Sequence, residues 1–203
     1  LGKCIEFKIP LWFANLDLRK AFDRIEWPQL FAALEEQGLP NGYNDLLARL
    51  YCEQRDFLSS GEAFPILRGV RQGDVLSPML FNAGLEQAIQ KWKAKLTNVR
   101  FADDLIVYAH SMEELSESLS FLAEELRNIG LDFNSKKTKI FTTDREAFDS
   151  ESPVYIDAAA DMIELVRRRD THKYLGVNLS GDLTQCGKAN LAHPLRCAWM
   201  NFH

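Results

Sequence analysis

The stretch Val99–Tyr108, which reads VRFADDLIVY, decides the fold. Apolar residues that favour β-structure flank the adjacent acids Asp103 and Asp104, and this pattern predicts two short strands that meet at a tight turn. Neighbouring carboxylates repel each other, so a divalent cation would stabilise them at a turn between buried strands. A solvated acidic turn is the alternative for this pair taken alone.

A third acid stands at the end of another predicted strand. The segment from Ile9 to Leu18 is mostly apolar, and Asp17 lies at its end, ahead of a helix that Pro28 would begin. One carboxylate at a strand end and two at a hairpin turn can converge on one point. Three such carboxylates suit two Mg²⁺ ions, roughly 3.5–4 Å apart, for nucleotidyl transfer. Asp17 alone is also compatible with a surface acid or a helix-approach cap.

A polar loop between glycines forms the third informative segment. The stretch 68–82, RGVRQGDVLSPMLFN, places Arg71 and Gln72 between two glycines. Ser77 is suited to cap a helix with Pro78 at its first position, and apolar residues follow at helical spacing. Glycines allow a backbone to approach a ligand closely, so the loop suits a nucleotide or a template strand. A capped helix that binds no ligand is the alternative.

In this order, the three segments resemble the motifs of reverse transcriptases. The segments 17–23 (DLRKAFD), 71–78 (RQGDVLSP) and 101–105 (FADDL) resemble the first three catalytic motifs. Two later segments, 130–139 (GLDFNSKKTK) and 173–177 (KYLGV), resemble the fourth motif and the primer grip. The Arg-Gln-Gly form and the Tyr-Leu-Gly ending are more similar to non-LTR (LINE-type) retrotransposons than to retroviral enzymes or group II introns. The resemblance covers about residues 11–182.

The resemblance implies a role for each motif residue. The metal ligands would be Asp17, Asp103, Asp104 and the main-chain carbonyl of Leu18, and they would hold two Mg²⁺ ions, with Mn²⁺ as a substitute. The catalytic residues would be Asp17, Asp103, Asp104 and Lys137. The nucleotide-binding residues would be Phe22, Arg71, Gln72 and Gly73. The primer grip would be Tyr174, Leu175 and Gly176.

Two of these roles have structural alternatives. Phe22 would crowd a 2′-hydroxyl and so select deoxynucleotides, but a phenylalanine on the helix after Asp17 is also typical of a core. Lys137 would donate a proton to the pyrophosphate, but its neighbours Lys136 and Lys139 also fit a solvated basic strand edge.

The implied activity is RNA-directed DNA polymerisation in retrotransposition. Its partners would be an RNA template, a DNA primer and deoxynucleoside triphosphates. The protein would be intracellular, and the resemblance alone implies a nuclear location. One alternative is a catalytically inactive retrotransposon-derived remnant that at most binds nucleic acid or a partner. Another is a different palm-fold enzyme, such as a nucleotidyl cyclase, which leaves the segments 71–73 and 174–176 unexplained. An RNA-templated RNA polymerase is disfavoured by Ala102 before the acid pair and by Phe22.

Composition sets further bounds. The 203 residues, 46% apolar and 26% charged, suffice for one sizeable globular domain. No apolar run approaches the ~20 residues that cross a membrane. The cysteines Cys4, Cys52, Cys186 and Cys197 are scattered and are interpreted as reduced thiols, and a zinc site of Cys186, His193 and Cys197 has no common spacing. The net charge of −5 argues against strong nucleic-acid binding, although basic residues cluster at 136–139 and 167–173.

The predicted architecture is α+β, a polymerase palm with a split βαβ (ferredoxin-like) sheet. Helices are expected from Pro28 to Gln37, after an Asn41 cap, and after a Ser111–Glu114 capping box to Gly130. Strands are expected at 139–143, 154–157 and 162–166. Residues 1–182 would form the palm with a partial fingers segment, and residues 183–203 would begin a truncated thumb. With fingers and thumb largely missing, and a deletion expected between residues 85 and 101, the chain is interpreted as a fragment or decayed copy of a polyprotein.

Overall fold

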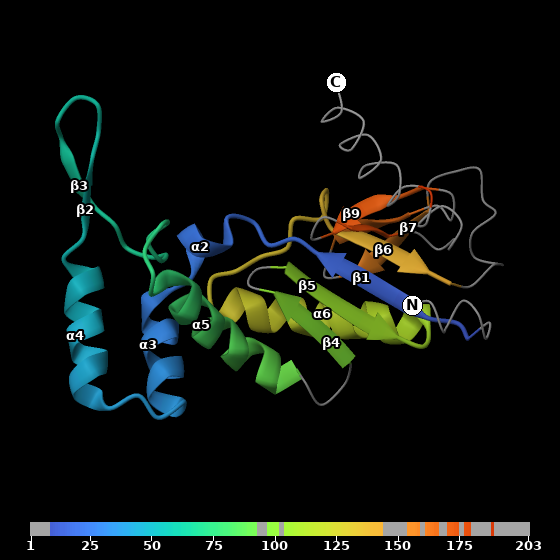
Figure 1. Cartoon of the computed structure of the whole chain (residues 1–203), viewed down its shortest axis with the longest axis horizontal. Helices are drawn as coiled ribbons and strands as arrows, with labels where there is room; N and C mark the ends of the chain where they lie inside the picture. The colour runs from blue at the N-terminus through green and yellow to red at the C-terminus, as the bar shows by residue number, and fades with distance from the viewer. Residues whose placement is uncertain are drawn as a thin grey trace, which may run out of the picture.

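A six-stranded sheet in the order β4-β5-β1-β6-β8-β7 forms the centre of the molecule (Figure 1). The computed structural model describes residues 9–92, 97–101, 104–143, 154–158, 161–166, 170–174, 177–179 and 188. The strands of this sheet are β1 (Trp12–Leu16), β4 (Thr97–Phe101), β5 (Asp104–Ala109), β6 (Lys139–Thr142), β7 (Val154–Ala158) and β8 (Asp161–Leu165).

Four of these strands and two helices make a β-α-β-β-α-β unit. Helix α5 (Ser77–Trp92) leads from the first part of the chain to β4, and α6 (Met112–Asn128) joins β5 to β6. Strand β5 lies between β1 and β4 and is antiparallel to both, and β6 is antiparallel to the other side of β1. This is the split βαβ arrangement, so the predicted α+β palm architecture is confirmed.

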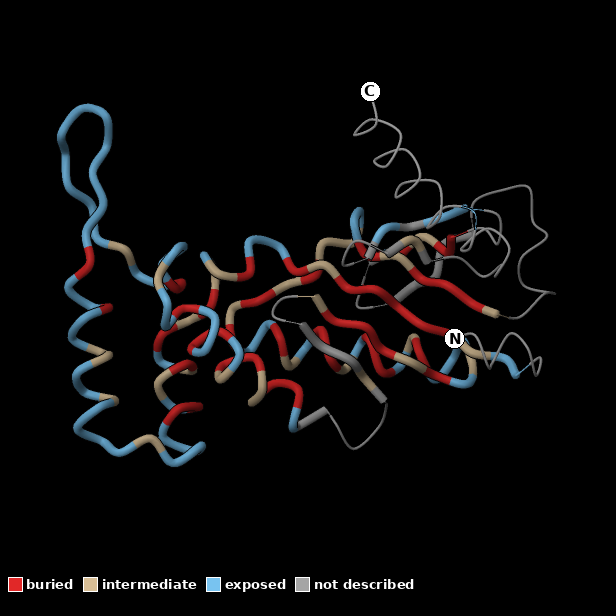
Figure 2. Tube along the Cα trace, in the orientation of Figure 1, coloured by how far each residue is buried: buried red, intermediate tan, exposed pale blue. Residues whose placement is uncertain are grey.

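The main core lies between this sheet and the two helices. Helix α6 buries the apolar face that its sequence predicts, and α5 buries its own at helical spacing. Figure 2 shows the buried residues along the central strands and the inward helix faces. The buried helix residues are Leu80, Phe81, Leu85 and Ile89 of α5, and Leu115, Leu119, Leu122 and Leu126 of α6. A smaller cluster around Phe13, Ile106 and Phe141 covers the other face of the sheet.

A helical arm extends from one end of the sheet. It contains α3 (Trp27–Glu36), α4 (Asn41–Cys52) and the hairpin of β2 (Arg55–Phe57) and β3 (Ala63–Pro65), whose residues are all exposed (Figures 1 and 2). Short helix α2 (Ala21–Arg24) connects β1 to this arm. A second hairpin, β9 (His172–Tyr174) and β10 (Val177–Leu179), comes from the predicted primer-grip segment.

The first strand and two predicted helix starts differ from expectation. Strand β1 runs only from Trp12 to Leu16, shorter than the predicted 9–18. Asn41 is the first helical residue and not the cap, because Pro40 holds the N-cap position and its carbonyl accepts the first-turn hydrogen bonds. Ser77 likewise lies inside α5, because Asp74 closes the preceding turn by accepting hydrogen bonds from Leu76 N (2.9 Å) and Ser77 N (3.3 Å).

The remaining predicted elements agree closely with the structure. Ser111 Oγ accepts a hydrogen bond from Glu114 N at 3.1 Å, while the Glu114 carboxylate accepts from His110 N at 2.9 Å rather than from Ser111. Gly130 follows α6 with φ of +82°, as a helix stop requires. The described residues do not include Cys186, His193 or Cys197, whose spacing matches no common zinc site, nor the arginines 167–169 or the loop 144–153. Of the segment 183–203, which is expected to begin a thumb, they include only Lys188.

Candidate active site

Asp17 and the acidic hairpin lie at the same end of neighbouring strands. Leu16 of β1 is paired with Leu105 of β5, so Asp17 and Asp104 each stand one residue beyond this pair. Phe101 is paired with Asp104, so β4 and β5 form an antiparallel hairpin with two residues between the strands. These residues, 102–103, lie outside the described residues and include Asp103. Asp17 and Asp104 are both half-buried.

The turn 134–138 holds the main chain of Asp17. Asp17 N donates to Thr138 Oγ1 at 3.2 Å, and Asp17 O accepts from Asn134 N at 2.8 Å. Leu18 forms an antiparallel bridge with Phe133, flanked by a 2.9 Å hydrogen bond from Arg19 N to Asp132 O. In such a bridge the flanking residues make the hydrogen bonds, so the Leu18 carbonyl points to the opposite side, where β5 lies.

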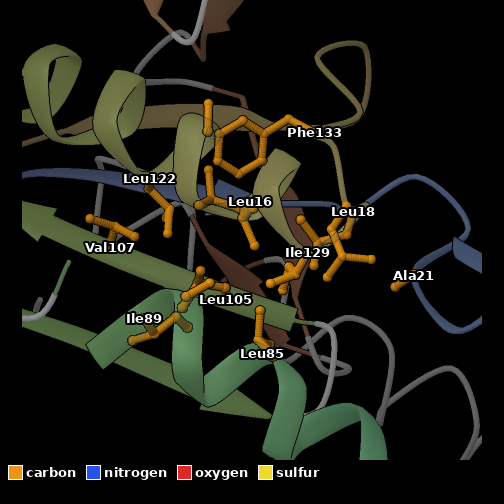
Figure 3. Close-up of a cluster of buried hydrophobic side chains, with 14 of the residues drawn as sticks. Leu16, Leu18, Ala21, Leu85, Ile89, Leu105, Val107, Leu122, Ile129 and Phe133 are labelled. Carbon is orange, nitrogen blue, oxygen red and sulfur yellow. The ribbon is translucent and has the colours of Figure 1, made fainter. Parts of the chain in front are cut away.

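The chain after Leu18 turns sharply into α2. Lys20 adopts the left-handed conformation, with φ of 46°, immediately before the helix. Leu16, Leu18 and Ala21 anchor this segment in the core, where Figure 3 draws them together with Leu85 and Leu105. Between these anchors Arg19 and Lys20 are exposed, while Asp17 is half-buried.

Phe22 serves the core and faces a cavity. Its ring stacks on Phe81 of α5, with ring centroids 4.7 Å apart and planes inclined by 18°. It is only half-buried, and it also lines the pocket described below. The two interpretations of Phe22 from sequence are therefore compatible.

The glycine loop is docked on the segment 22–27. Gly69 N donates to Ile25 O (2.8 Å), Val70 N donates to Phe22 O (2.6 Å), and the buried Trp27 Nε1 donates to Gly69 O (2.7 Å). Gly69 has φ of +89°, and a Cβ there would lie 2.8 Å from the Asp23 carbonyl carbon. This position therefore requires glycine for both conformation and space.

An exposed side-chain hydrogen bond also joins the glycine loop to the segment 22–27. Gln72 Nε2 donates to Asp23 Oδ1 at 2.9 Å, which joins the first and second motifs at the surface.

These contacts surround a pocket of about 620 Å³. Its lining comes from three segments far apart in sequence, namely the chain from β1 into α2, the glycine loop and the turn 134–138. The lining residues are Asp17, Leu18, Arg19, Lys20, Ala21, Phe22, Asp23, Arg24, Gln72, Asn134 and Lys137. Among these described lining residues four are cationic and two are acidic, a balance of +2 in a chain whose net charge is −5. The described part of the lining is thus basic, and the acids of the β4–β5 hairpin are not included in this balance.

Some predicted site residues lie away from the pocket. Arg71 donates to Leu50 O of α4 at 3.4 Å and does not line the pocket, and neither does Gly73, which is exposed with φ of +85°. Tyr174 ends β9, while Leu175 and Gly176 lie outside the described residues.

Other residues of the site had no assigned role from sequence. Asp23, Asn134 and Thr138 each form a hydrogen bond with a predicted site residue. All three lie inside the motifs quoted above, and this position is the signal in the sequence that could have identified them as site residues. Trp27 lies outside the motifs, and nothing in the sequence indicated its hydrogen bond to Gly69.

The donor set at the strand end suits a hard cation. Asp17 and Asp104 offer carboxylate oxygens, and Leu18 offers a carbonyl oxygen directed toward β5, which are the ligand types that Mg²⁺ prefers. The described residues contain no cluster of three or more His, Cys, Asp or Glu side chains that could hold a metal, and Asp103 is not among them.

The described part of the chain also contains no helix long and apolar enough to span a membrane.

Comparison with known proteins gives a consistent match. A family model described as reverse transcriptase (RNA-dependent DNA polymerase) matches residues 6–179. The Pol polyprotein of the R2DM retrotransposable element of Drosophila melanogaster is 30% identical over 187 residues, which cover 83% of this chain and 18% of that protein. The polymerase of the mobile element jockey, also from Drosophila melanogaster, is 28% identical over 190 residues, or 84% of this chain and 20% of that protein. The chain thus spans about a fifth of their length.

Solved structures of telomerases have a similar fold. Apo telomerase from Candida tropicalis aligns with a TM-score of 0.57 and 14% identity over 88% of this chain and 36% of that chain. Telomerase from Candida albicans, in complex with the TWJ fragment of telomeric RNA, aligns with a TM-score of 0.56 and 16% identity over 88% of this chain and 31% of that chain. At this identity the likeness shows the fold alone.

Proposed function

Because the chain belongs to the reverse transcriptase (RNA-dependent DNA polymerase) family, with relatives in non-LTR retrotransposons, we propose that it catalyses RNA-directed DNA synthesis by two-metal nucleotidyl transfer at the pocket. The single observation that supports this most is the pocket itself. It gathers segments of the first, second and fourth motifs around a basic surface at the strand end that carries Asp17.

Asp17, Asp103, Asp104 and the Leu18 carbonyl would hold two Mg²⁺ ions, or Mn²⁺ in their place. When bound, the ions would lower the pKa of the attacking 3′-hydroxyl and neutralise charge on the leaving pyrophosphate. The carboxylates contribute by fixing the ion positions at the end of β1 and β5, where the 3′ end of a primer and a triphosphate can meet.

The other pocket residues would bind and orient the nucleotide. The cations Arg19, Lys20, Arg24 and Lys137 would offset the charge of the triphosphate, and Lys137 would hand a proton to the leaving pyrophosphate. Phe22, braced against Phe81, would press on the 2′ position of the sugar. Gln72, joined to Asp23, and the adjacent residues Arg71 and Gly73 would border the nucleotide and the template.

The remaining assignments follow from family membership. Residues 1–182 would form the palm with part of the fingers, and residues 183–203 would begin the thumb. The hairpin of β9 and β10, with Tyr174, Leu175 and Gly176, would support the primer end. The ligands would be an RNA template, a DNA primer and deoxynucleoside triphosphates. The chain would act in the nucleus as part of a longer retrotransposon polyprotein.

The test measures metal-dependent nucleotide binding and primer extension by the same protein. The 203-residue chain is titrated with a fluorescent dATP analogue with and without Mn²⁺, and it is assayed for primer extension on an RNA template with Mg²⁺. Asp17→Asn is expected to abolish metal-dependent binding and any extension. Asp45→Asn, an exposed carboxylate of α4 outside the pocket, is the matched control and is expected to behave as the unmodified chain.

Equal metal-dependent nucleotide binding by the Asp17→Asn and unmodified chains would contradict the proposed site. Binding that depends on Asp17, but without extension in this chain and in a longer polypeptide that contains it, would favour the inactive, binding-only remnant.

A further inference from the structure

Two threonines close the ends of the contact between β1 and β6. The main-chain ladder between these strands runs from the pair Trp12 and Thr142 to the pair Asn15 and Lys139. Beyond its first end, Thr143 Oγ1 accepts a hydrogen bond from Leu11 N at 2.9 Å. Beyond its other end, Thr138 Oγ1 accepts one from Asp17 N at 3.2 Å. In each case a side-chain oxygen takes the place of a main-chain acceptor.

The two ends differ in what else they hold. Thr143 is half-buried, and among the described residues its hydroxyl donates to Ile9 O and its amide donates to Leu11 O, both just before β1. Thr138 is fully buried beside the pocket lining. The first end is therefore a structural contact, and the second lies at the site.

The turn that carries Thr138 holds both sides of Asp17. Asn134 N donates to Asp17 O at 2.8 Å, and Asn134 O accepts from Lys137 N (3.0 Å) and Thr138 N (2.8 Å). The amide and the carbonyl of Asp17 are thus bonded to one short turn, and the same turn presents Lys137 to the pocket.

We propose that Thr138 is a positioning residue, which fixes the direction of the Asp17 carboxylate in the pocket that Lys137 also lines. The proposal rests on the proposed function, because it takes Asp17 as a metal ligand. Thr138 itself would touch neither the metal nor the nucleotide, and it acts through the main chain of Asp17.

The physical reason is the geometry of a short side chain. Only two rotatable bonds separate the main chain of an aspartate from its carboxylate oxygens, so a shift of the Asp17 main chain moves those oxygens in every rotamer. Loss of the Thr138 hydroxyl leaves the Asp17 amide without its acceptor, and the amide then shifts to reach water or another oxygen. Loss of a group that orients a metal ligand typically weakens metal binding by about 10–100-fold.

The experiment compares matched threonine variants of the full 203-residue chain. Electron paramagnetic resonance gives the dissociation constant for Mn²⁺, and thermal unfolding is recorded for each variant. Thr138→Val keeps the shape and removes the oxygen, and it is expected to weaken Mn²⁺ binding by about tenfold or more. Thr138→Ser keeps the oxygen and is expected to stay within about twofold of the unmodified chain. Thr143→Val removes the equivalent hydroxyl at the distant end and is expected to leave the Mn²⁺ affinity unchanged.

The outcomes separate this proposal from the proposed function. If Thr138→Val and Thr143→Val bind Mn²⁺ equally well, or if Thr138→Ser fails to restore affinity, the positioning role is wrong. If Asp17→Asn binds Mn²⁺ as well as the unmodified chain, or the unmodified chain binds none, the proposed function fails and this inference fails with it. If Thr138→Val does not fold, Thr138→Ala and Thr143→Ala replace the valine pair, and equal affinities in those two would overturn the inference.

Discussion

Gly69 and Gly73 share a left-handed backbone but differ in their surroundings. A Cβ at Gly69 would meet the Asp23 main chain at 2.8 Å, whereas a Cβ at Gly73 would meet nothing within 4 Å. We expect Gly73→Ala to lower the free energy of unfolding by about 1–2 kcal/mol, from backbone conformation alone. Gly69→Ala should cost a further ~1–3 kcal/mol from overpacking, as measured by urea denaturation. Equal losses would mean that the glycine loop is not docked on Asp23.

Phe22 allows a test of the sugar gate that is separate from stability. Phe22→Val is expected to raise ribonucleotide use relative to deoxynucleotide use, because less bulk would oppose a 2′-hydroxyl. It should also lower the free energy of unfolding by about 1–3 kcal/mol, because the half-buried ring stacks on Phe81. The measurement is nucleotide competition in primer extension, in any polypeptide containing this chain that polymerises.

Phe81→Leu is the control for that experiment. It removes the same ring stack from the α5 side, so stability should fall while the sugar preference is retained. An unchanged sugar preference in Phe22→Val would show that Phe22 acts only as a core residue.

At the residue scale, motif order predicted much of the pocket lining but not its hydrogen bonds. The motifs make Asp17, Phe22, Gln72 and Lys137 candidate site residues, and all four line one pocket. They make Arg71 a candidate as well, yet it donates to the Leu50 carbonyl, because α4 lies within its reach. Such a contact depends on how the helical arm packs, which no local pattern in the sequence encodes.

The starts of α5 and α6 each have a serine in the sequence, but the two serine hydroxyls differ in their hydrogen bonds. Ser111 caps α6 through Glu114 N at 3.1 Å, whereas the buried Ser77 hydroxyl has no hydrogen-bond partner among the described residues. We expect Ser111→Ala to lower the free energy of unfolding by about 1 kcal/mol. Ser77→Ala should be neutral or slightly stabilising, because it removes a buried unpaired hydroxyl. Thermal unfolding of both variants tests the contrast, and a larger loss for Ser77→Ala would contradict it.

The same comparison explains which elements were predictable from sequence. Helix α6 has its cap, apolar face and glycine stop within one continuous segment, so local physics determines it. The start of α5 depends on Asp74, whose carboxylate accepts a hydrogen bond from Leu76 N and whose carbonyl accepts one from Ser77 N. Asp74 and Ser77 are both plausible caps in the sequence, so local pattern does not decide between them. The order of strand, helix, hairpin, helix and strand predicts the split βαβ arrangement of the sheet. No local pattern gives the partner of each individual strand, because most strand partners are distant in sequence.

At the scale of the whole molecule, the described pocket lining and the chain carry opposite charge. The described lining has a balance of +2, while the chain carries −5. We therefore expect the lining cations to attract phosphate at short range, and the remainder of the chain to repel it at long range. The Debye length, beyond which charge repulsion is largely screened, is about 8 Å at physiological ionic strength and about 30 Å at 0.01 M.

This opposition predicts a specific salt response. The chain should bind an RNA–DNA hybrid weakly, and binding should fall as salt is added, because phosphate contacts release counterions. Neutralising three exposed acids outside the pocket, by Glu35→Gln, Glu53→Gln and Glu62→Gln, changes the net charge from −5 to −2. Fluorescence anisotropy should then show several-fold tighter hybrid binding near 0.01 M salt and almost no change near 0.5 M, where screening acts within a few ångströms.

The matched variant Lys137→Gln removes a pocket cation and should weaken binding at both salt concentrations. If the triple variant gains equally at high and low salt, the acids act by local contact, and the long-range repulsion is wrong.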